Sequence, residues 1–306
     1  MESSSSKKSY IALIATAAIW GTSFLFITTS VEAVGDNYFV SLFFRLLFGL
    51  LSSAILFLVL NIKVMRSQLF YFKRKVVYIL AFLNFGGLFF QFIAATLTVS
   101  HKLALLVNCH VIFVPFISYL MLKERLNYKR IIGIIIGIIG LILLVTGGNF
   151  QTLLEGELLG DIYCLIAAVF WAFYIVLTRK LFYKNEENSK SIYKPLNLSL
   201  ITTILSFILL LPLIPFYFST FGITQSFTLN IWLQFLYLGI ICSTFAYLLY
   251  FYGLKSISAT NASFILLVEP TVAIILGILI LSEVFLIFSI IGASLIITSI
   301  AILSLT

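Results

Sequence analysis

The sequence contains few charged residues. Only 10% of its 306 residues are Asp, Glu, Lys or Arg, whereas 62% are apolar, and the mean hydropathy is +1.17. A water-soluble domain of this length would lack the polar residues needed to cover its surface. The alternating segments of about ten residues that build an outer-membrane barrel are also missing. The sequence therefore predicts an all-α integral membrane protein.

Reactive motifs are missing too. The three cysteines, Cys109, Cys164 and Cys242, lie inside apolar runs and give neither a disulfide framework nor a metal spacing. No HExxH, GxSxG or Walker sequence occurs, and no nucleotide-binding domain is present. We expect no enzyme, no primary pump, no cofactor and no metal. A membrane-embedded enzyme and a lipid-translocating protein, each using the same cavity in the membrane interior, remain the alternatives.

Long apolar runs fill the chain instead, and a helix that crosses a bilayer needs about 20 such residues. The run behind MESSSSKKSY is too long for a signal-peptide core, so we take it as the first span. The ten predicted spans are Tyr10–Thr29, Tyr38–Leu60, Val76–Thr98, Leu103–Leu122, Arg130–Gly147, Gly160–Thr178, Pro195–Phe216, Asn230–Leu254, Thr260–Leu281 and Leu286–Ser304.

Lys and Arg gather in alternate loops between these runs. If the N-terminus is cytoplasmic, all of the 19 basic residues except Lys102 and Arg45 fall in cytoplasmic segments. This asymmetry follows the positive-inside rule. It predicts a multi-pass protein of the plasma (inner) membrane with both termini in the cytoplasm. The net charge of +8 then reflects topology, and we expect no nucleic-acid partner.

The two halves of the chain repeat one another. AAIWGTSF (17–24) resembles AAVFWAFY (167–174), and MLKERL (121–126) matches ILSEVF (280–285). Each half has an odd number of spans, so the second half must be inverted, and the basic loops change position accordingly. Inverted repeats are a common architecture of secondary transporters. We expect two five-helix repeats, residues 1–148 and 149–306.

Several stretches resemble the EamA-type members of the drug/metabolite transporter superfamily. They are IWGTSF (19–24), SLFFRLLFG (41–49), TVSHKLALL (98–106), LKERL (122–126), GDIYCLIAAVFWAFYIVLTRKL (160–181) and FAYLLYFYGLKSISATNASFILLVEP (245–270). The resemblance covers nearly the whole chain. It implies a ten-helix carrier, in many cases an exporter of amino acids or other small metabolites. His110, at the position that matches Glu269 in the other half, departs from the hydrophobic or small polar residue that is usual there.

Glu269 lies near the centre of the ninth span and is followed by Pro270. A carboxylate at that depth costs about 2.5–3.5 kcal/mol on insertion scales, so it needs a partner, a proton or a function. Pairing Glu124 with Glu283 places His110 opposite Glu269. We predict that Glu269, with His110 assisting, binds substrate and couples its release to proton entry. The alternative is that Glu269 braces the kink at Pro270.

Other polar and aromatic side chains lie well inside the predicted spans. Amides within a membrane face the bundle interior, and aromatic rings with polar tips often wall small-ligand sites. Helix packing or lipid contact is the alternative for each of them. The predicted substrate-binding residues are Trp20, Asn84, Gln91, His110, Trp171, Tyr174, Ser243, Tyr247, Tyr250 and Glu269.

Two further patterns concern packing and charge. We place Arg45 near the outer face, where it snorkels, pairs with Glu32 or Asp36, or attracts anions. Gly133, Gly137 and Gly140 allow close helix approach, within the chain or in a homodimer.

The predicted function is a secondary transporter of a small metabolite, an amino acid or related zwitterion or cation. It would work by alternating access in the lipid bilayer, as an exporter, with protons as the coupling ion, and as a monomer or homodimer.

Overall fold

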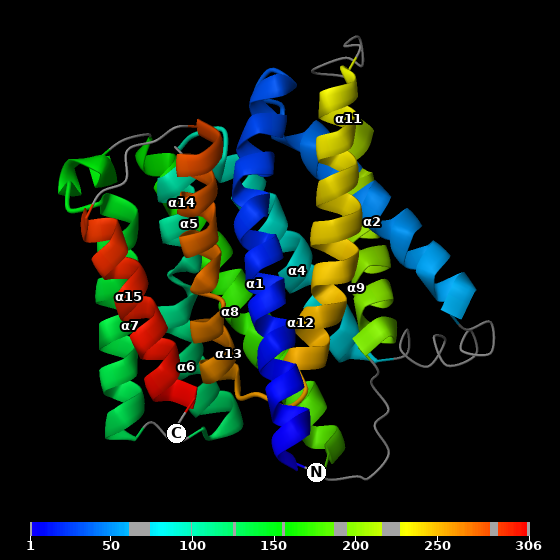
Figure 1. Cartoon of the computed structure of the whole chain (residues 1–306). Helices are drawn as coiled ribbons and strands as arrows, with labels where there is room; N and C mark the ends of the chain where they lie inside the picture. The colour runs from blue at the N-terminus through cyan, green and yellow to red at the C-terminus, as the bar shows by residue number, and fades with distance from the viewer. Residues whose placement is uncertain are drawn as a thin grey trace.

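The computed structural model describes residues 2–60, 74–98, 100–124, 127–154, 157–186, 195–215, 227–281 and 287–304. Over these ranges the chain is a bundle of helices without strands (Figure 1). Its helices are α1 (Glu2–Ala33), α2 (Tyr38–Leu60), α4 (Lys75–Ala94), α5 (Ser100–Asn108), α6 (His110–Leu122), α7 (Tyr128–Thr146), η2 (Phe150–Leu154), α8 (Leu158–Glu186), α9 (Pro195–Leu210), η3 (Leu211–Leu213), α11 (Leu229–Leu236), η4 (Tyr237–Phe245), α12 (Ala246–Leu254), α13 (Ala259–Ile265), α14 (Val268–Leu281) and α15 (Ile287–Ser304).

These helices have the length and composition of membrane spans. Eight helical stretches among the described residues are long and apolar enough to cross a bilayer, and Asn197–Leu213 and Ile287–Leu303 are shorter apolar helices. Large apolar side chains such as Ile11, Val59 and Phe116 point outward, as expected of surfaces that face lipid. The prediction of an all-α membrane protein with about ten helices is confirmed.

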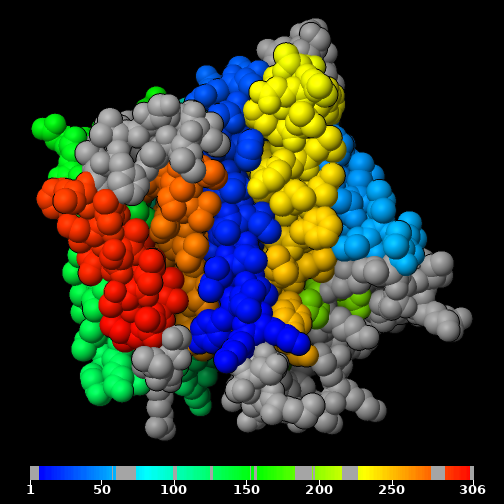
Figure 2. Space-filling view, in the orientation of Figure 1, coloured from blue at the N-terminus to red at the C-terminus, as the bar shows by residue number. Residues whose placement is uncertain are grey.

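Helix α1 lies in the middle of the bundle. Figures 1 and 2 show it between α13 and α14 on one side and the α11–η4–α12 span on the other. A Cβ atom added at Gly21 would lie 2.6 Å from the backbone oxygen of Glu269. The absence of a side chain at Gly21 therefore lets α1 approach the backbone of α14 directly.

The fourth and ninth spans are each broken near their centres, whereas the sequence predicted continuous helices with a kink at Pro270 in the ninth. In the ninth span the break lies at Leu266–Leu267, just before Glu269. Pro270 has no N–H to donate to the Leu266 carbonyl, and the Glu269 N–H donates to it instead, at 2.8 Å. In the fourth span Cys109 separates α5 from α6, and Nδ1 of His110 lies 3.1 Å from the Val107 carbonyl oxygen. Pro115, by contrast, lies inside α6.

The eighth span carries another irregularity that the sequence did not predict. Its middle third, η4, is a π-helix, in which each carbonyl pairs five residues ahead. The hydroxyl of Ser243 donates to the Leu238 carbonyl, five residues back, at 3.0 Å. Trp20 of α1 donates its indole N–H to the Cys242 carbonyl at 2.9 Å. The π-helix thus fixes α1 against the eighth span.

The predicted close approach at the glycines of the fifth span occurs inside the chain, against α15 and α13. A Cβ atom at Gly137 would lie 2.8 Å from the Phe264 ring, and Ser299 donates to the Gly133 carbonyl at 2.7 Å. Gly140 faces Gly292, where the α7 and α15 backbones meet. These glycines are therefore used in packing the fifth span on the tenth.

We expect Gly292→Ala to destabilise the fold and Gly133→Ala to be tolerated. A Cβ atom at Gly292 would lie 2.3 Å from the Leu144 backbone nitrogen, and backbone atoms cannot move away cheaply. Overpacking of this kind typically costs about 1–3 kcal/mol. At Gly133 the nearest atom, 3.0 Å away, belongs to the flexible Leu303 side chain. Thermal unfolding in detergent should separate the two variants, and equal unfolding temperatures would contradict the packing argument.

Candidate substrate cavity

A cavity lies at the centre of the bundle, between α1, α2, α4, the two broken spans, α8 and α12. It contains about 490 Å³ of space outside the atoms, any open mouth included. Its lining residues are Trp20, Ser23, Phe24, Arg45, Gln91, Val107, His110, Trp171, Tyr174, Ile175, Tyr247, Tyr250, Leu266 and Glu269. Eight of the ten predicted substrate-binding residues are in this set. The cavity combines aromatic surface with a few polar groups, as small-molecule sites usually do.

Glu269 reaches the cavity from the first turn of α14. Its side chain is only 6% exposed, and no basic residue of the described chain forms an ion pair with it. The amide of Asn108, which also donates to the Ala104 carbonyl at 2.9 Å, is its polar neighbour. Asn108 was not among the predicted substrate-binding residues, and the structure shows its proximity to this carboxyl group. The break before Pro270 therefore presents a nearly enclosed carboxyl group to the cavity.

His110 reaches the same cavity from the other broken span. The ring is 4% exposed, and its Nδ1 lies against the Val107 carbonyl, so the N–H of the neutral ring resides on Nδ1. This leaves Nε2 as an acceptor, and no described residue forms a hydrogen bond with Nε2. The structure thus brings the histidine of one half and the glutamate of the other to one cavity.

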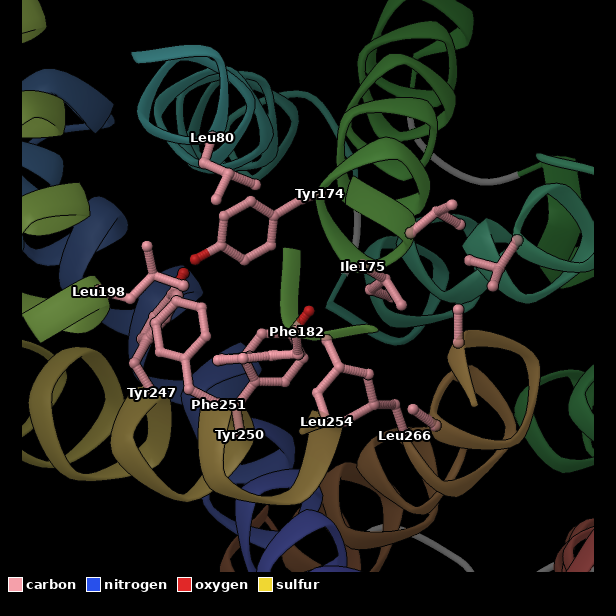
Figure 3. Packing of buried hydrophobic residues seen from close by; sticks show 14 of the residues in the cluster. Leu80, Tyr174, Ile175, Phe182, Leu198, Tyr247, Tyr250, Phe251, Leu254 and Leu266 are labelled. Carbon is pink, nitrogen blue, oxygen red and sulfur yellow. The ribbon is translucent and has the colours of Figure 1, made fainter. Parts of the chain in front are cut away.

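The aromatic wall of the cavity consists of Trp20, Trp171, Tyr174, Tyr247 and Tyr250. The Trp20 ring lies 5.1 Å from Tyr247 and 5.3 Å from Tyr250, measured between ring centroids. Tyr174 stacks on Tyr250 at 5.9 Å with an interplanar angle of 10°. Figure 3 shows Tyr174 of α8 facing Tyr247, Tyr250 and Phe251 of α12. The predicted aromatic cluster forms because α1, α8 and α12 meet here.

Asn84 and Ser243 are the two predicted residues that do not line the cavity. Both hydrogen-bonding ends of the Asn84 amide are used, because Nδ2 donates to Ser206 at 3.0 Å and Oδ1 accepts from Tyr247 at 2.5 Å. Ser243 accepts from Nε of Arg45 at 3.1 Å. Their positions give them a supporting role behind side chains that do face the cavity. Gln91, seven residues after Asn84 on α4, does line it.

We expect Tyr247→Phe to lower stability by about 1–3 kcal/mol, because the Asn84 carbonyl would lose its donor inside the bundle. Tyr247 is 3% exposed, so water cannot easily replace the hydroxyl. The control is Tyr252→Phe on the same helix, where the ring is 44% exposed. An unfolding temperature of Tyr247→Phe equal to that of the control would contradict the proposed role of this hydrogen bond.

The structure excludes two of the three roles that the sequence left open for Arg45, snorkelling and pairing with an outer-loop acid. Arg45 does not snorkel to the outer face, because its side chain is 3% exposed, and it pairs with neither Glu32 nor Asp36. Its guanidinium lies 5.7 Å from the centroid of the Phe92 ring and lines the cavity. The α2 sequence SLFFRLLFG carried a signal for this position, since an arginine between apolar residues is costly unless it faces the bundle interior.

The remaining lining residues were not predicted. Ser23 and Phe24 belong to IWGTSF, a stretch quoted above for its family resemblance, so a signal was present. Val107 and Ile175 are aliphatic residues within apolar helices, and Leu266 is an aliphatic residue at the break of the ninth span. Nothing in the sequence separates these three from neighbours that face lipid. Only the packing of the helices decides which of them reach the cavity.

Two ionic groups hold helix ends together away from the cavity. The Glu124 carboxylate, at the end of α6, accepts from the Ala259 N–H at 3.0 Å and from the Thr260 hydroxyl at 2.9 Å, and so caps the start of α13. Lys102 pairs with Asp161 at 2.8 Å at the start of α8. Glu283, which the sequence pairs with Glu124 in the repeat, lies outside the described residues.

The model of the EamA-like transporter family matches residues 7–146 and, separately, residues 158–305. The chain belongs to the EamA-like transporter family. This EamA-like chain is therefore a membrane transporter, as the resemblance implied.

Relatives of this EamA-like transporter share the description. It is 27% identical to an uncharacterized transporter of Archaeoglobus fulgidus, with 96% of this chain and 97% of that protein covered. It is 26% identical to the uncharacterized transporter YoaV of Bacillus subtilis, with 94% of each covered. An uncharacterized transporter of Clostridium kluyveri is 31% identical, but the match spans 62% of this chain and only 58% of that protein.

A solved crystal structure has the same fold. The TM-score is 0.72, and the superposition covers 98% of this chain and 97% of the other at 18% sequence identity. At this identity the likeness concerns the arrangement of the helices alone.

Proposed function

We propose that this EamA-like transporter is a secondary carrier that exports a small metabolite by alternating access. The substrate class is an amino acid or a related zwitterion or cation. The cavity carries the proposal, because it joins an aromatic wall to Glu269 and His110 at the breaks of two spans. Transporter sites are typically formed near the membrane midplane by discontinuous helices.

Residues 1–148 and 149–306 are taken as two inverted repeats that rock about the cavity. The two separate family matches support this division. The first helices of the two halves, α1 and α8, run in opposite directions in Figure 1. The breaks that precede His110 and Glu269 fall at corresponding places in the two halves, as expected when one repeat has been used twice.

The coupling ion in this proposal is the proton, and its acceptor is Glu269. The other titratable or charged groups of the cavity are His110, Tyr174, Tyr247, Tyr250 and Arg45. A carboxyl group cannot hold a proton and an ammonium group at once, so proton entry releases the substrate. His110 offers a free acceptor nitrogen from the opposite broken span and serves as an assisting proton site.

The carrier is placed in the plasma (inner) membrane with both termini in the cytoplasm. The start of α1 and the end of α15 lie at the same end of the bundle in Figure 1. The α4, α7 and α9 starts and the α12 end are also at this end. Described basic residues belong to these helix ends, namely Lys7 and Lys8, Arg74 and Lys75, Lys129 and Arg130, and Lys255. This distribution satisfies the positive-inside rule.

An untargeted comparison of metabolites in the growth medium tests the proposal. Cells would express the wild type, Glu269→Gln or an empty vector. We expect amino acids or related compounds to accumulate in the medium only with the wild type. No difference between wild type and vector, in the medium and after reconstitution into liposomes, would contradict an export function. Accumulation that survives Glu269→Gln would keep the carrier and remove Glu269 from its mechanism.

A further inference from the structure

Arg45 is a buried cation without a counter-ion among the residues that the structure describes. Its side chain is 3% exposed, and no described carboxylate forms an ion pair with it. Nε donates to Ser243 and the guanidinium faces the Phe92 ring, but Nη1 has no hydrogen-bond partner in the described part of the chain. A buried charge without a partner destabilises the fold, as does removing one member of a buried ion pair. The missing partner should therefore be an anion that enters and leaves.

The place from which an anion can arrive is the cavity. Arg45 lines it from α2, and Glu269 lines it from α14. Helix α1 contacts both sides, because Trp20 donates to the Cys242 carbonyl of η4, next to Ser243, while Gly21 lies against the Glu269 backbone. The two charged groups do not pair with each other, so each is available to a bound molecule.

We propose that Arg45 binds the carboxylate of the substrate and that the transported molecules are zwitterions with an ammonium group directed at Glu269. The inference rests on the proposed function of the cavity as the substrate site and narrows its substrate class. A planar guanidinium whose Nε is held by Ser243 still presents its outer N–H groups to a carboxylate. A cation without a carboxylate gains no such contact and is repelled by Arg45.

Tryptophan fluorescence of the purified full chain in detergent provides the test. The chain has three tryptophans, and Trp232→Phe leaves Trp20 and Trp171, which both line the cavity. Each L-amino acid of a panel is titrated beside its carboxamide and its decarboxylated amine. The free amino acid is expected to bind about 10- to 100-fold more tightly than either derivative.

Arg45→Gln should reduce this preference to about one, because a neutral amide no longer favours a carboxylate over a carboxamide. Arg45→Lys, which keeps the charge without the planar fork, should retain part of it and also serves if Arg45→Gln does not fold. The control is Lys129→Gln, which removes a positive charge at the exposed start of α7 and should leave the preference unchanged.

Two results overturn the carboxylate site. One is a wild type that binds the amine or the carboxamide as tightly as the amino acid. The other is a folded Arg45→Gln variant that keeps the wild-type preference. If the wild type binds no member of the panel, the proposed amino-acid carrier itself is contradicted. This outcome is seen in the wild type before any Arg45 variant is measured, so the two failures can be told apart.

Discussion

Glu269→Gln is expected to abolish transport driven by a pH gradient while the protein still folds. Glutamine has nearly the same shape but cannot take up or release a proton. A gradient of about one pH unit supplies about 1.4 kcal/mol per proton, which corresponds to about tenfold accumulation of substrate. In proteoliposomes the wild type should approach this ratio, and the variant should equilibrate its substrate at a ratio of about one.

The matched control is Glu124→Gln, which neutralises a carboxylate that caps α13 away from the cavity. It should weaken the fold but leave accumulation dependent on the gradient. His110→Gln tests the assisting role and should reduce the accumulation less than Glu269→Gln. If the Glu269→Gln variant still accumulates substrate in response to the pH gradient, Glu269 has only a structural role at the break before Pro270.

Gly21→Leu should destroy both the stability of the bundle and the cavity. Even a Cβ atom at Gly21 would lie 2.6 Å from the Glu269 carbonyl oxygen and 2.7 Å from Cβ of Val272. The first of these atoms is backbone, so α1 must move away from α14. Overpacking by a single group costs about 1–3 kcal/mol, and leucine adds several groups. Trp20 and Glu269 would then be displaced together.

The unfolding temperature and ligand titration measure this effect in the same preparation. Gly21→Ala should show a smaller loss of both stability and binding, in the same direction. Ile14→Phe is the control, because it enlarges a side chain on the outward face of α1 that is already 44% exposed. If Gly21→Leu unfolds at the temperature of the control and binds normally, the close approach of α1 and α14 is not essential.

Much of the fold follows from the sequence because the bilayer imposes it. A chain in lipid must satisfy its backbone internally, so long apolar runs give helices, and their approximate limits can be predicted. Trp20, Trp171, Tyr247 and Glu269 were predicted as binding residues because aromatic rings with polar tips and carboxylates inside apolar spans are typical of small-ligand sites. The structure then brings these side chains to one cavity.

The exact positions of the helix breaks and of the π-helix could not be predicted, because they depend on individual backbone hydrogen bonds. Pro270 announces a kink, but whether the chain turns before or after it depends on which N–H reaches the Leu266 carbonyl. The break at Cys109 has no proline within the following turn. The surroundings of Arg45 were not predicted because its partner, Ser243, lies in a distant part of the chain.

The separation of Arg45 and Ser243 in the sequence affects how the chain folds during synthesis. Arg45 enters the membrane on α2, whereas Ser243 lies 198 residues further along the chain. Asn84 likewise precedes the Ser206 that accepts its hydrogen bond, and Trp20 precedes the Cys242 carbonyl. During translation the first five spans must therefore wait in lipid with these groups unpartnered. We expect the N-terminal half to depend on the C-terminal half, or on an insertion chaperone, to escape degradation while the ribosome completes the chain.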